Sequence, residues 1–189
     1  VTVHKSGPNK GRVRSAQFYL FGTKEPLPFQ VKYLTAAEEL YFYSNENSFR
    51  YSLSTGKHIC ELTQLRKLTI GAYGLTELPD EFANLKNLEY LDISGNNFEE
   101  IPAVLSPENL PNLTALIINA NQRNVTNDLF NNYKENSGGL SHECPLREDG
   151  TREFPRRLLK WNNLDTLRLS VNYLQGTIPD LMDDPDFPK

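Results

Sequence analysis

Cysteine, tryptophan, methionine and blocks of positive charge are all scarce in this chain of 189 residues. It has two Cys, one Trp and one Met, and its 20 Lys and Arg residues are dispersed among 24 Asp and Glu residues. Two cysteines are too few for a disulfide scaffold or for a zinc site, which needs about four ligands at close spacing. No apolar run approaches the ~18 residues of a membrane span. We therefore expect no nucleic-acid ligand, because no basic surface is available to bind phosphates, and no membrane span.

Motifs for catalysis, cofactors and metals are also missing. His4, His58 and His142 are dispersed, and the chain has no H-E-x-x-H, no G-x-S-x-G and no phosphate-binding loop. His142, Glu143 and Cys144 stand together, but no second cluster has the spacing of metal ligands, so we interpret them as part of a solvated loop. The acidic pairs lack the D-x-D-x-D-G pattern of a calcium loop. The sequence predicts no enzyme activity, no cofactor and no metal.

Leucine and asparagine are abundant, with 27 and 19 copies, and this bias indicates internal repeats. The clearest copy, residues 85–102, reads LKNLEYLDISGNNFEEIP and follows L-x-x-L-x-x-L-x-L-x-x-N-x-L-x-x-I. Five further copies, the first degenerate, bring the total to six. Their corresponding positions are Val13, Ala37, Leu65, Leu88, Leu113 and Leu164. The first four intervals are the length of one leucine-rich unit, whereas the last is about twice as long.

The long last interval is interpreted as one repeat with an insertion. Residues 153–167, EFPRRLLKWNNLDTL, match residues 77–91, ELPDEFANLKNLEYL, position for position. The surplus falls within residues 122–151, a polar stretch that reads as an excursion loop with a short helical turn near LFNNYKE. We expect a single domain over residues 1–189, with an N-terminal edge at 1–12, the insertion in the fifth repeat and a C-terminal edge at 180–189.

The repeat predicts an α/β solenoid. Each alternating L-x-L segment forms a short strand, and stacked strands about 4.8 Å apart give a parallel concave sheet, with short helical or irregular segments on the convex side. A Leu-Pro or similar pair opens five of the return segments, as at Leu78-Pro79. An Asn of each repeat bridges backbone groups of neighbouring turns. Asn45, Asn96, Asn121 and Asn172 fill this column, while Phe21 and Tyr73 replace it in the first and third repeats, where we expect irregular loops.

The motif resembles the leucine-rich repeat family over roughly residues 11–179. The ending NYLQGTIPD resembles repeats of plant receptor ectodomains, whereas DEFANLKNLEYLDISGNNFEEIP with a long insertion is similar to secreted or surface repeat proteins of gut-type Bacteroidetes. We favour the bacterial resemblance, because plant ectodomains usually begin with a Cys-containing cap and residues 1–12 contain no Cys. The resemblance implies a non-enzymatic module that recognises a partner, usually a protein, on its concave face.

Two strand positions of each repeat lie outside the core and are therefore candidates for binding. Across the six repeats, each position forms a column of residues. The first column holds Gln17, Tyr41, Thr69, Asp92, Ile117 and Arg168. The second holds Tyr19, Tyr43, Gly71, Ser94, Asn119 and Ser170. We predict an aromatic patch where Tyr19, Tyr41 and Tyr43 meet, near Tyr90. The predicted ligand-binding set is Tyr19, Tyr41, Tyr43, Gln17, Glu39, Lys67, Tyr90, Asp92 and Arg168.

Several alternatives stay open. The patch fits a protein partner, a carbohydrate that stacks on the rings, or the recognition domain of a larger enzyme, and the tyrosines could instead shield a thin first repeat whose core positions are small. We expect an extracellular or cell-surface location, including attachment by a lipid on a removed N-terminal segment. Cys60 is in register with Lys32 and Ala83, at a position that tolerates charge, so it should lie near the convex surface. A disulfide from there to Cys144 would pin the insertion. At the C-terminal edge, Leu181, Met182 and Phe187 or a neighbouring chain should cover the last core layer.

Overall fold

The computed structural model describes residues 1–19, 27, 29–44, 51–96, 98, 101–119, 158 and 160–169, with the backbone alone for residues 51–56. Predictions for the insertion, the C-terminal edge and Cys144 fall outside these residues. So do those for Phe21, Asn45, Asn121 and Asn172.

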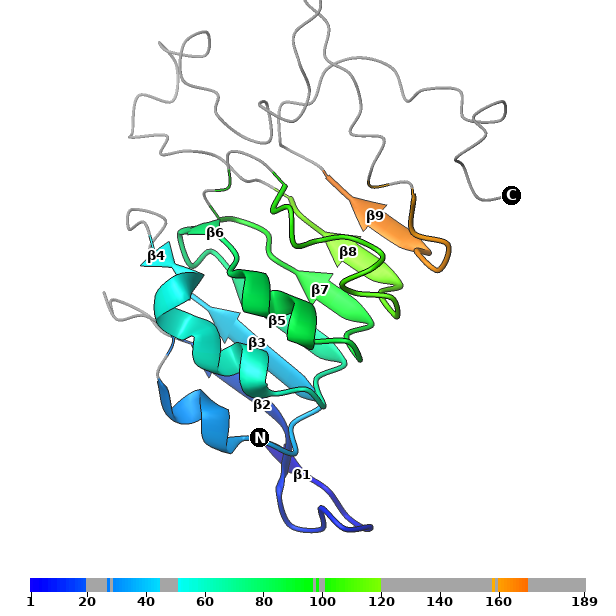
Figure 1. The fold of residues 1–189 in the computed structure, drawn as a ribbon. Helices are drawn as coiled ribbons and strands as arrows, with labels where there is room; N and C mark the ends of the chain where they lie inside the picture. The colour runs from blue at the N-terminus through cyan, green and yellow to red at the C-terminus, as the bar shows by residue number, and fades with distance from the viewer. Residues whose placement is uncertain are drawn as a thin grey trace, which may run out of the picture.

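A seven-stranded sheet runs through the described part of the chain (Figure 1). Its strands, in spatial order, are β1 (Thr2–Val3), β2 (Val13–Tyr19), β3 (Glu39–Tyr43), β5 (Lys67–Gly71), β7 (Tyr90–Asp92), β8 (Ala115–Ile117) and β9 (Thr166–Arg168). The strands from β2 to β9 are parallel, whereas β1 pairs antiparallel with β2. The expected parallel sheet is confirmed, while the count of six repeats and the solenoid stay predictions.

The strand register aligns the inward leucine positions of the repeat. The aligned residues are Ala16, Leu40, Leu68, Leu91, Leu116 and Leu167. The first five are buried and Leu167 is partly buried. Because side chains alternate along a strand, this alignment turns the residues on either side of each leucine to the opposite face of the sheet.

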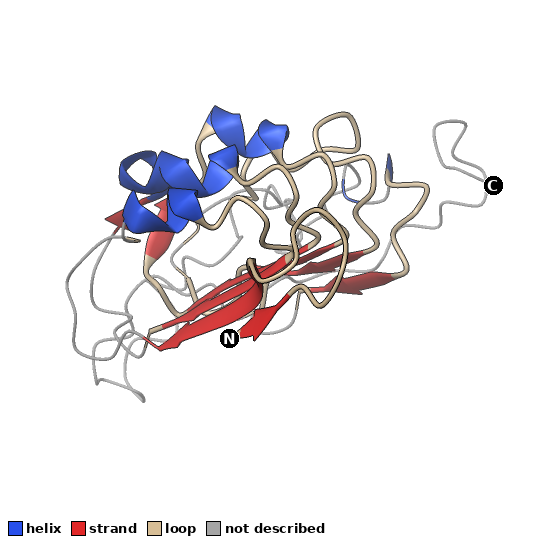
Figure 2. Cartoon of the chain, turned by 90° about the horizontal axis from the view of Figure 1, so that it is seen from below, coloured by secondary structure: helices blue, strands red, loops and turns tan. Residues whose placement is uncertain are grey.

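Short 3-10 helices cover one face of the sheet. They are η1 (Phe29–Tyr33), η2 (Leu53–Glu61) and η3 (Asp80–Asn84), and a second, two-stranded sheet joins β4 (Tyr51–Ser52) to β6 (Leu75–Glu77). Figure 2 shows the helices on one side and the main strands on the other. Pro79 precedes η3 with extended backbone, as the Leu-Pro pair predicts. The described residues contain no α-helix: an α-helix is about 10 Å across, which fits poorly over strands about 4.8 Å apart.

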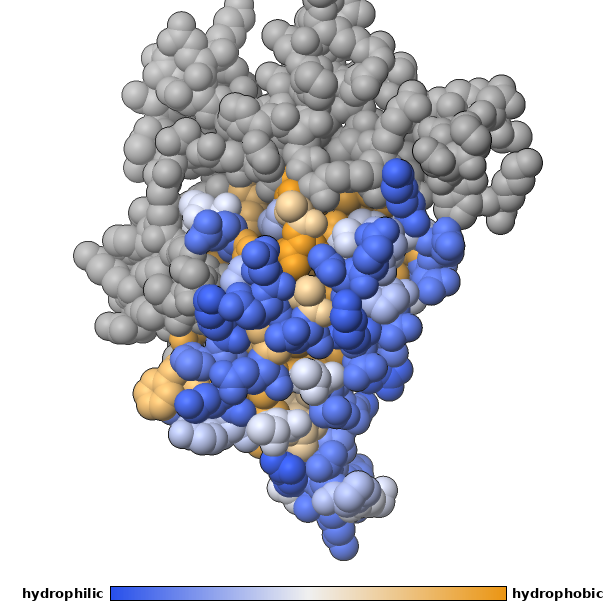
Figure 3. Space-filling model, in the orientation of Figure 1, coloured by the Kyte–Doolittle hydropathy of each residue, from blue (hydrophilic) through white to orange (hydrophobic). Residues whose placement is uncertain are grey.

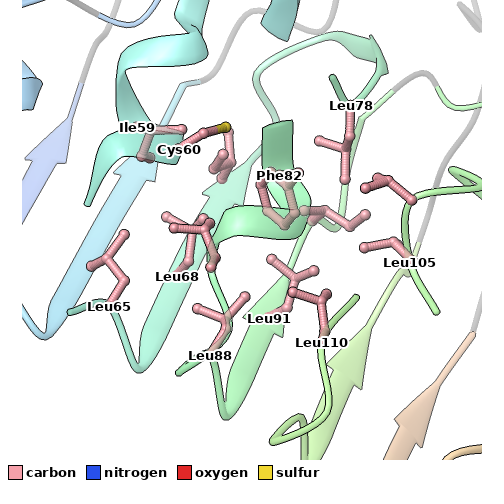
Figure 4. Close-up of a cluster of buried hydrophobic side chains, with 14 of the residues drawn as sticks. Ile59, Cys60, Leu65, Leu68, Leu78, Phe82, Leu88, Leu91, Leu105 and Leu110 are labelled. Atoms are coloured by element: carbon pink, nitrogen blue, oxygen red, sulfur yellow. The ribbon is translucent and has the colours of Figure 1, made fainter. Parts of the chain in front are cut away.

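The core lies between the sheet and the helices. Figure 4 shows strand residues such as Leu68 and Leu91 packed against Phe82 of η3 and Ile59 of η2. In the first repeat, where Ala16 is small, the ring of Phe18 stacks on Phe42 with centroids 5.0 Å apart and planes 8° from parallel. Aromatic packing therefore joins the first two repeats at the inward position that Ile70 occupies in the next strand.

The turn around Tyr73 is irregular, as its missing asparagine predicts. Ala72 and Gly74 both have positive φ, 53° and 75°. Asn96 of the next repeat serves this turn: its Oδ1 accepts hydrogen bonds from the N–H of Tyr73 at 3.0 Å and of Leu75 at 3.1 Å. The side chain of Tyr73 is buried in the core. Asn96 thus bridges to the preceding turn, as the repeat predicts, although that turn has no asparagine of its own.

The prediction that Cys60 lies near the surface is wrong. Cys60 is buried, with 1% of its surface exposed, and its thiol is free. The prediction rested on the equivalent position Lys32 of η1, which tolerates charge. Because η2 packs between η1 and η3, both of its sides are covered by neighbouring helices. The same repeat position is therefore exposed in η1, at the end of the row of helices, and buried in η2, in the middle of the row.

Candidate recognition surface

All nine sequence-predicted site residues lie on one face of the main sheet, opposite the 3-10 helices. We call it the outer sheet face. The register pairs Gln17 with Tyr41, Tyr41 with Thr69, and so on through Asp92 and Ile117 to Arg168. It also aligns Tyr19, Tyr43 and Gly71 in one row, and Glu39, Lys67 and Tyr90 in another. The alternation along each strand places these three rows on the same face.

Tyr19 and Tyr43 form a stacked pair at the N-terminal end of this face. Their ring centroids are 5.5 Å apart and their planes lie 18° from parallel. Tyr43 is half-buried, because its ring leans over Gly71 of the next strand, where a Cβ would lie only 3.2 Å from Tyr43 Cδ1. Tyr19 is 58% exposed. The missing side chain at Gly71 is therefore what allows the pair to lie across the sheet.

Tyr41 and Tyr90 complete the aromatic group. The hydroxyl of Tyr41 donates a hydrogen bond of 3.3 Å to Glu39 Oε2. Burial raises the pKa of Tyr41, and the charges of Glu39 and of Tyr43 and Tyr90 add to the increase. Burial also raises the pKa of Tyr90, with a further contribution from Asp92 that Arg168 opposes. Both phenols are protonated at neutral pH. The single hydroxyl proton of Tyr41 is donated to Glu39, so Tyr41 offers a ligand an acceptor oxygen, whereas the Tyr90 hydroxyl can donate or accept a hydrogen bond.

The charges on the outer sheet face differ in how they are paired. Glu39 Oε1 lies 3.7 Å from Lys67 Nζ and 3.7 Å from a terminal nitrogen of Arg14. Asp92 instead accepts a hydrogen bond from the backbone N–H of Ser94 at 3.0 Å. Neither Asp92 nor Arg168 forms an ion pair with another residue that the structure describes. The charge of Glu39 is thus neutralised near the tyrosines, whereas the charges of Asp92 and Arg168, toward β9, are available to a ligand.

Arg14 is a contributor that the sequence reasoning missed. Its Nε donates to Glu38 Oε2 at 2.8 Å, and two repeats later Arg66 donates to Glu89 Oε1 at 2.6 and 2.9 Å. These residues stand at the same repeat position, and their charge alternates from one strand to the next. That alternation is visible in the sequence once the repeat frame is known. The ion pair between Arg14 and Glu39 connects Glu39, and through it Tyr41, to β2.

The C-terminal half of the outer sheet face, from β5 to β9, is partly closed. Thr69 and Ile117 are 2% and 7% exposed, so they contribute little surface to a ligand. The accessible groups in the first predicted column are therefore Gln17, Tyr41, Asp92 and Arg168.

The sheet register and the repeat frame agree with a known family. Residues 40–180 match the family model of a leucine-rich repeat region. The chain belongs to the leucine-rich repeat family. A segment of 80 residues, 41% of this leucine-rich repeat chain, is 38% identical to Receptor-like protein 39 of Arabidopsis thaliana. The chain spans 9% of the length of that relative. Family and relative together indicate a protein-interaction module of the kind typical of non-enzymatic recognition proteins, and they do not show the bacterial resemblance.

No group of three or more His, Cys, Asp or Glu residues in the described part of this leucine-rich repeat chain could hold a metal ion. No helix in the described ranges is long and apolar enough to cross a membrane.

Proposed function

We propose that the outer sheet face binds a protein partner, with Tyr19, Tyr41 and Tyr43 as anchors. The observation that carries this proposal is the stack of Tyr19 on Tyr43, whose ring leans over Gly71, with Tyr19 exposed. Stacking orders both rings before a partner arrives, so little side-chain entropy remains to be lost on binding. Each anchor of this kind contributes roughly 1–3 kcal/mol.

The polar residues around the anchors set specificity. Glu39 and Lys67 neutralise one another beside Tyr41, whereas Asp92 and Arg168 present opposite charges farther along the sheet. A partner that places a basic group near Asp92 and an acidic group near Arg168 gains complementary contacts, and like charges there are rejected. Gln17 and Tyr90 add hydrogen-bonding groups at the edges of the patch.

Carbohydrate binding is the second candidate, favoured by the exposed ring of Tyr19. A sugar can pack its C–H groups on such a ring as readily as a protein side chain can. A glycan array that binds the wild-type chain, and loses binding in Tyr19→Ala, would select this alternative.

We further propose an extracellular or cell-surface location for a larger protein that contains this chain, in keeping with the resemblance to bacterial surface repeat proteins. The name of the plant relative, a receptor-like protein, supports a surface role. The protein could be attached to the membrane by a lipid or fused to an enzyme that uses this domain for recognition. The sequence of the full-length gene would distinguish these arrangements.

The experiment combines partner capture with mutation. A partner cross-linked to a photoreactive residue at position 19 is identified and titrated against the wild-type chain, Tyr41→Ala and Tyr43→Ala. We expect each variant to lower affinity by at least about tenfold, with little change in melting temperature. Gln64→Ala, at an exposed turn away from the outer sheet face, is the control. A fall in melting temperature with unchanged affinity per folded molecule would mean that the rings only shield the first repeat.

A further inference from the structure

A second group of exposed aromatic side chains lies on η1, on the helical side of the sheet. Phe29 and Tyr33 are 52% and 67% exposed, while Val31 between them is buried in the core. The other large hydrophobic or tyrosine side chains exposed in the described ranges are Val1 and Val3 at the N-terminus and Tyr19 on the outer sheet face. Figure 3 shows an apolar projection at the left edge of an otherwise mainly hydrophilic face, where η1 lies in Figure 1. This group is therefore separate from the proposed site.

Lys32 lies between the two rings. Its Nζ is 5.8 Å from the ring centroid of Phe29 and 5.4 Å from that of Tyr33. A cation within about 6 Å of an aromatic face is attracted by the ring, so the two contacts hold the ammonium group at the surface. The three-residue period of a 3-10 helix places Phe29 and Lys32 on the same side of η1.

Two carboxylates on the following helices, Glu61 of η2 and Glu81 of η3, are paired with other bases. Glu61 lies 3.1 Å from His58 Nδ1, and the His58 ring contacts Phe29 at a centroid distance of 6.4 Å. Glu81 pairs with Lys57 at 2.5 Å. Lys32 forms no ion pair with another described residue. The patch thus combines two exposed rings with a positive charge that lacks a carboxylate.

We propose that Phe29, Lys32 and Tyr33 form a second docking surface, the η1 patch, for a protein segment that presents a carboxylate next to apolar side chains. The apolar groups would cover the rings, and the carboxylate would pair with an ammonium group that is already positioned. A second copy of the chain fits this surface poorly, because a two-fold contact between η1 patches would bring Lys32 against its own counterpart. The helices and the outer sheet face lie on opposite sides (Figure 2), so both surfaces can be occupied together.

The probe for the test is a displayed library of random peptides selected on the whole immobilised chain. We expect selected peptides to carry Asp or Glu beside an aliphatic or aromatic residue. Phe29→Ser and Lys32→Glu should each lower their affinity by about tenfold or more, and added salt should weaken binding to the wild type. Gln30→Ala, an exposed change on the same helix, is the matched control and should leave the affinity unchanged. The rings are exposed, so the melting temperatures of the variants should stay close to wild type.

A charge exchange makes the test specific. Replacing the acidic residue of a selected peptide by Lys should abolish binding to the wild type and restore binding to Lys32→Glu. Selected peptides without an acidic residue, or with affinities that Phe29→Ser leaves unchanged, would overturn the proposal. So would a dimer in sedimentation equilibrium that Phe29→Ser dissociates, because the occupant would then be a second copy. None of these results depends on Tyr41 or Tyr43, so failure here is distinguishable from failure of the proposed function.

Discussion

Asn96 and Tyr73 are joined across two consecutive repeats by a hydrogen bond of 3.0 Å from the backbone N–H of Tyr73 to Asn96 Oδ1. The same side chain accepts from Leu75 N–H and donates to the carbonyls of Ile70 and Ile93, at 2.7 and 2.8 Å. Asn96 is 1% exposed. One buried amide therefore satisfies four backbone groups, and water cannot take its place.

Asn96→Ala should destabilise the protein severely. The change leaves two N–H and two C=O groups without these partners in the interior, and an unsatisfied buried group costs about 1–3 kcal/mol. We expect a loss of roughly 3–5 kcal/mol in the free energy of unfolding, measured by urea denaturation. Asn87→Ala is the control, because the exposed Asn87 donates one bond, to Thr63 O at 2.9 Å, and should cost about 1 kcal/mol or less. Equal losses in both variants would contradict the central role of Asn96.

Gly95→Ala should cost more than Gly7→Ala, although both glycines have positive φ, 70° and 77°. Both substitutions place an L residue in the left-handed region, at a cost of about 1 kcal/mol. At Gly95 the new Cβ would also lie 3.3 Å from the backbone of Ala72, whereas at Gly7 it would meet open space. Thermal unfolding of the two variants measures the difference, and a Gly95→Ala protein as stable as Gly7→Ala would show that the Ala72 turn moves freely.

Cys60 should make stability depend on pH in the alkaline range. Burial raises the pKa of the Cys60 thiol to about 12, whereas an unfolded thiol ionises near pH ~8.5. Because the unfolded state loses its proton first, this contribution to stability is present below pH ~8.5 and is lost as the pH rises toward 12. Between these limits the free energy of unfolding should fall more steeply in the wild type than in Cys60→Val. Iodoacetamide labelling at mildly alkaline pH should also reach Cys60 much more slowly in the folded than in the urea-unfolded protein.

Glu39→Gln should lower the pKa of Tyr41. Burial is the main cause of the raised pKa and remains in the variant, but the carboxylate that disfavours the phenolate is removed. The absorbance titration of wild type minus Tyr41→Phe isolates the Tyr41 phenolate and can be repeated in the Glu39→Gln background. Glu38→Gln, which removes a neighbouring carboxylate that bonds to Arg14 instead, should change the Tyr41 pKa less. A Tyr41 pKa that both variants leave unmoved would place its hydroxyl away from Glu39.

The sequence by itself determined the register of the sheet. The repeat frame fixes which residues are buried leucines, and the period of two along a strand then fixes which residues share a face with Tyr41 and Asp92. The missing asparagine at Tyr73 likewise predicted an irregular turn. These features follow from one repeating pattern, so they can be inferred from the amino-acid sequence alone.

Only the tertiary structure decided which side chains contact each residue and how deeply it is buried. The leaning of Tyr43 over Gly71, the burial of Cys60, the Arg14 contacts and the placement of Lys32 between two rings all depend on the neighbouring strand or helix. A repeat pattern gives equivalent positions the same description, as it did for Cys60 and Lys32. Their surroundings differ because η2 has a helix on each side of it, and burial is set by neighbours in space rather than by place in the repeat.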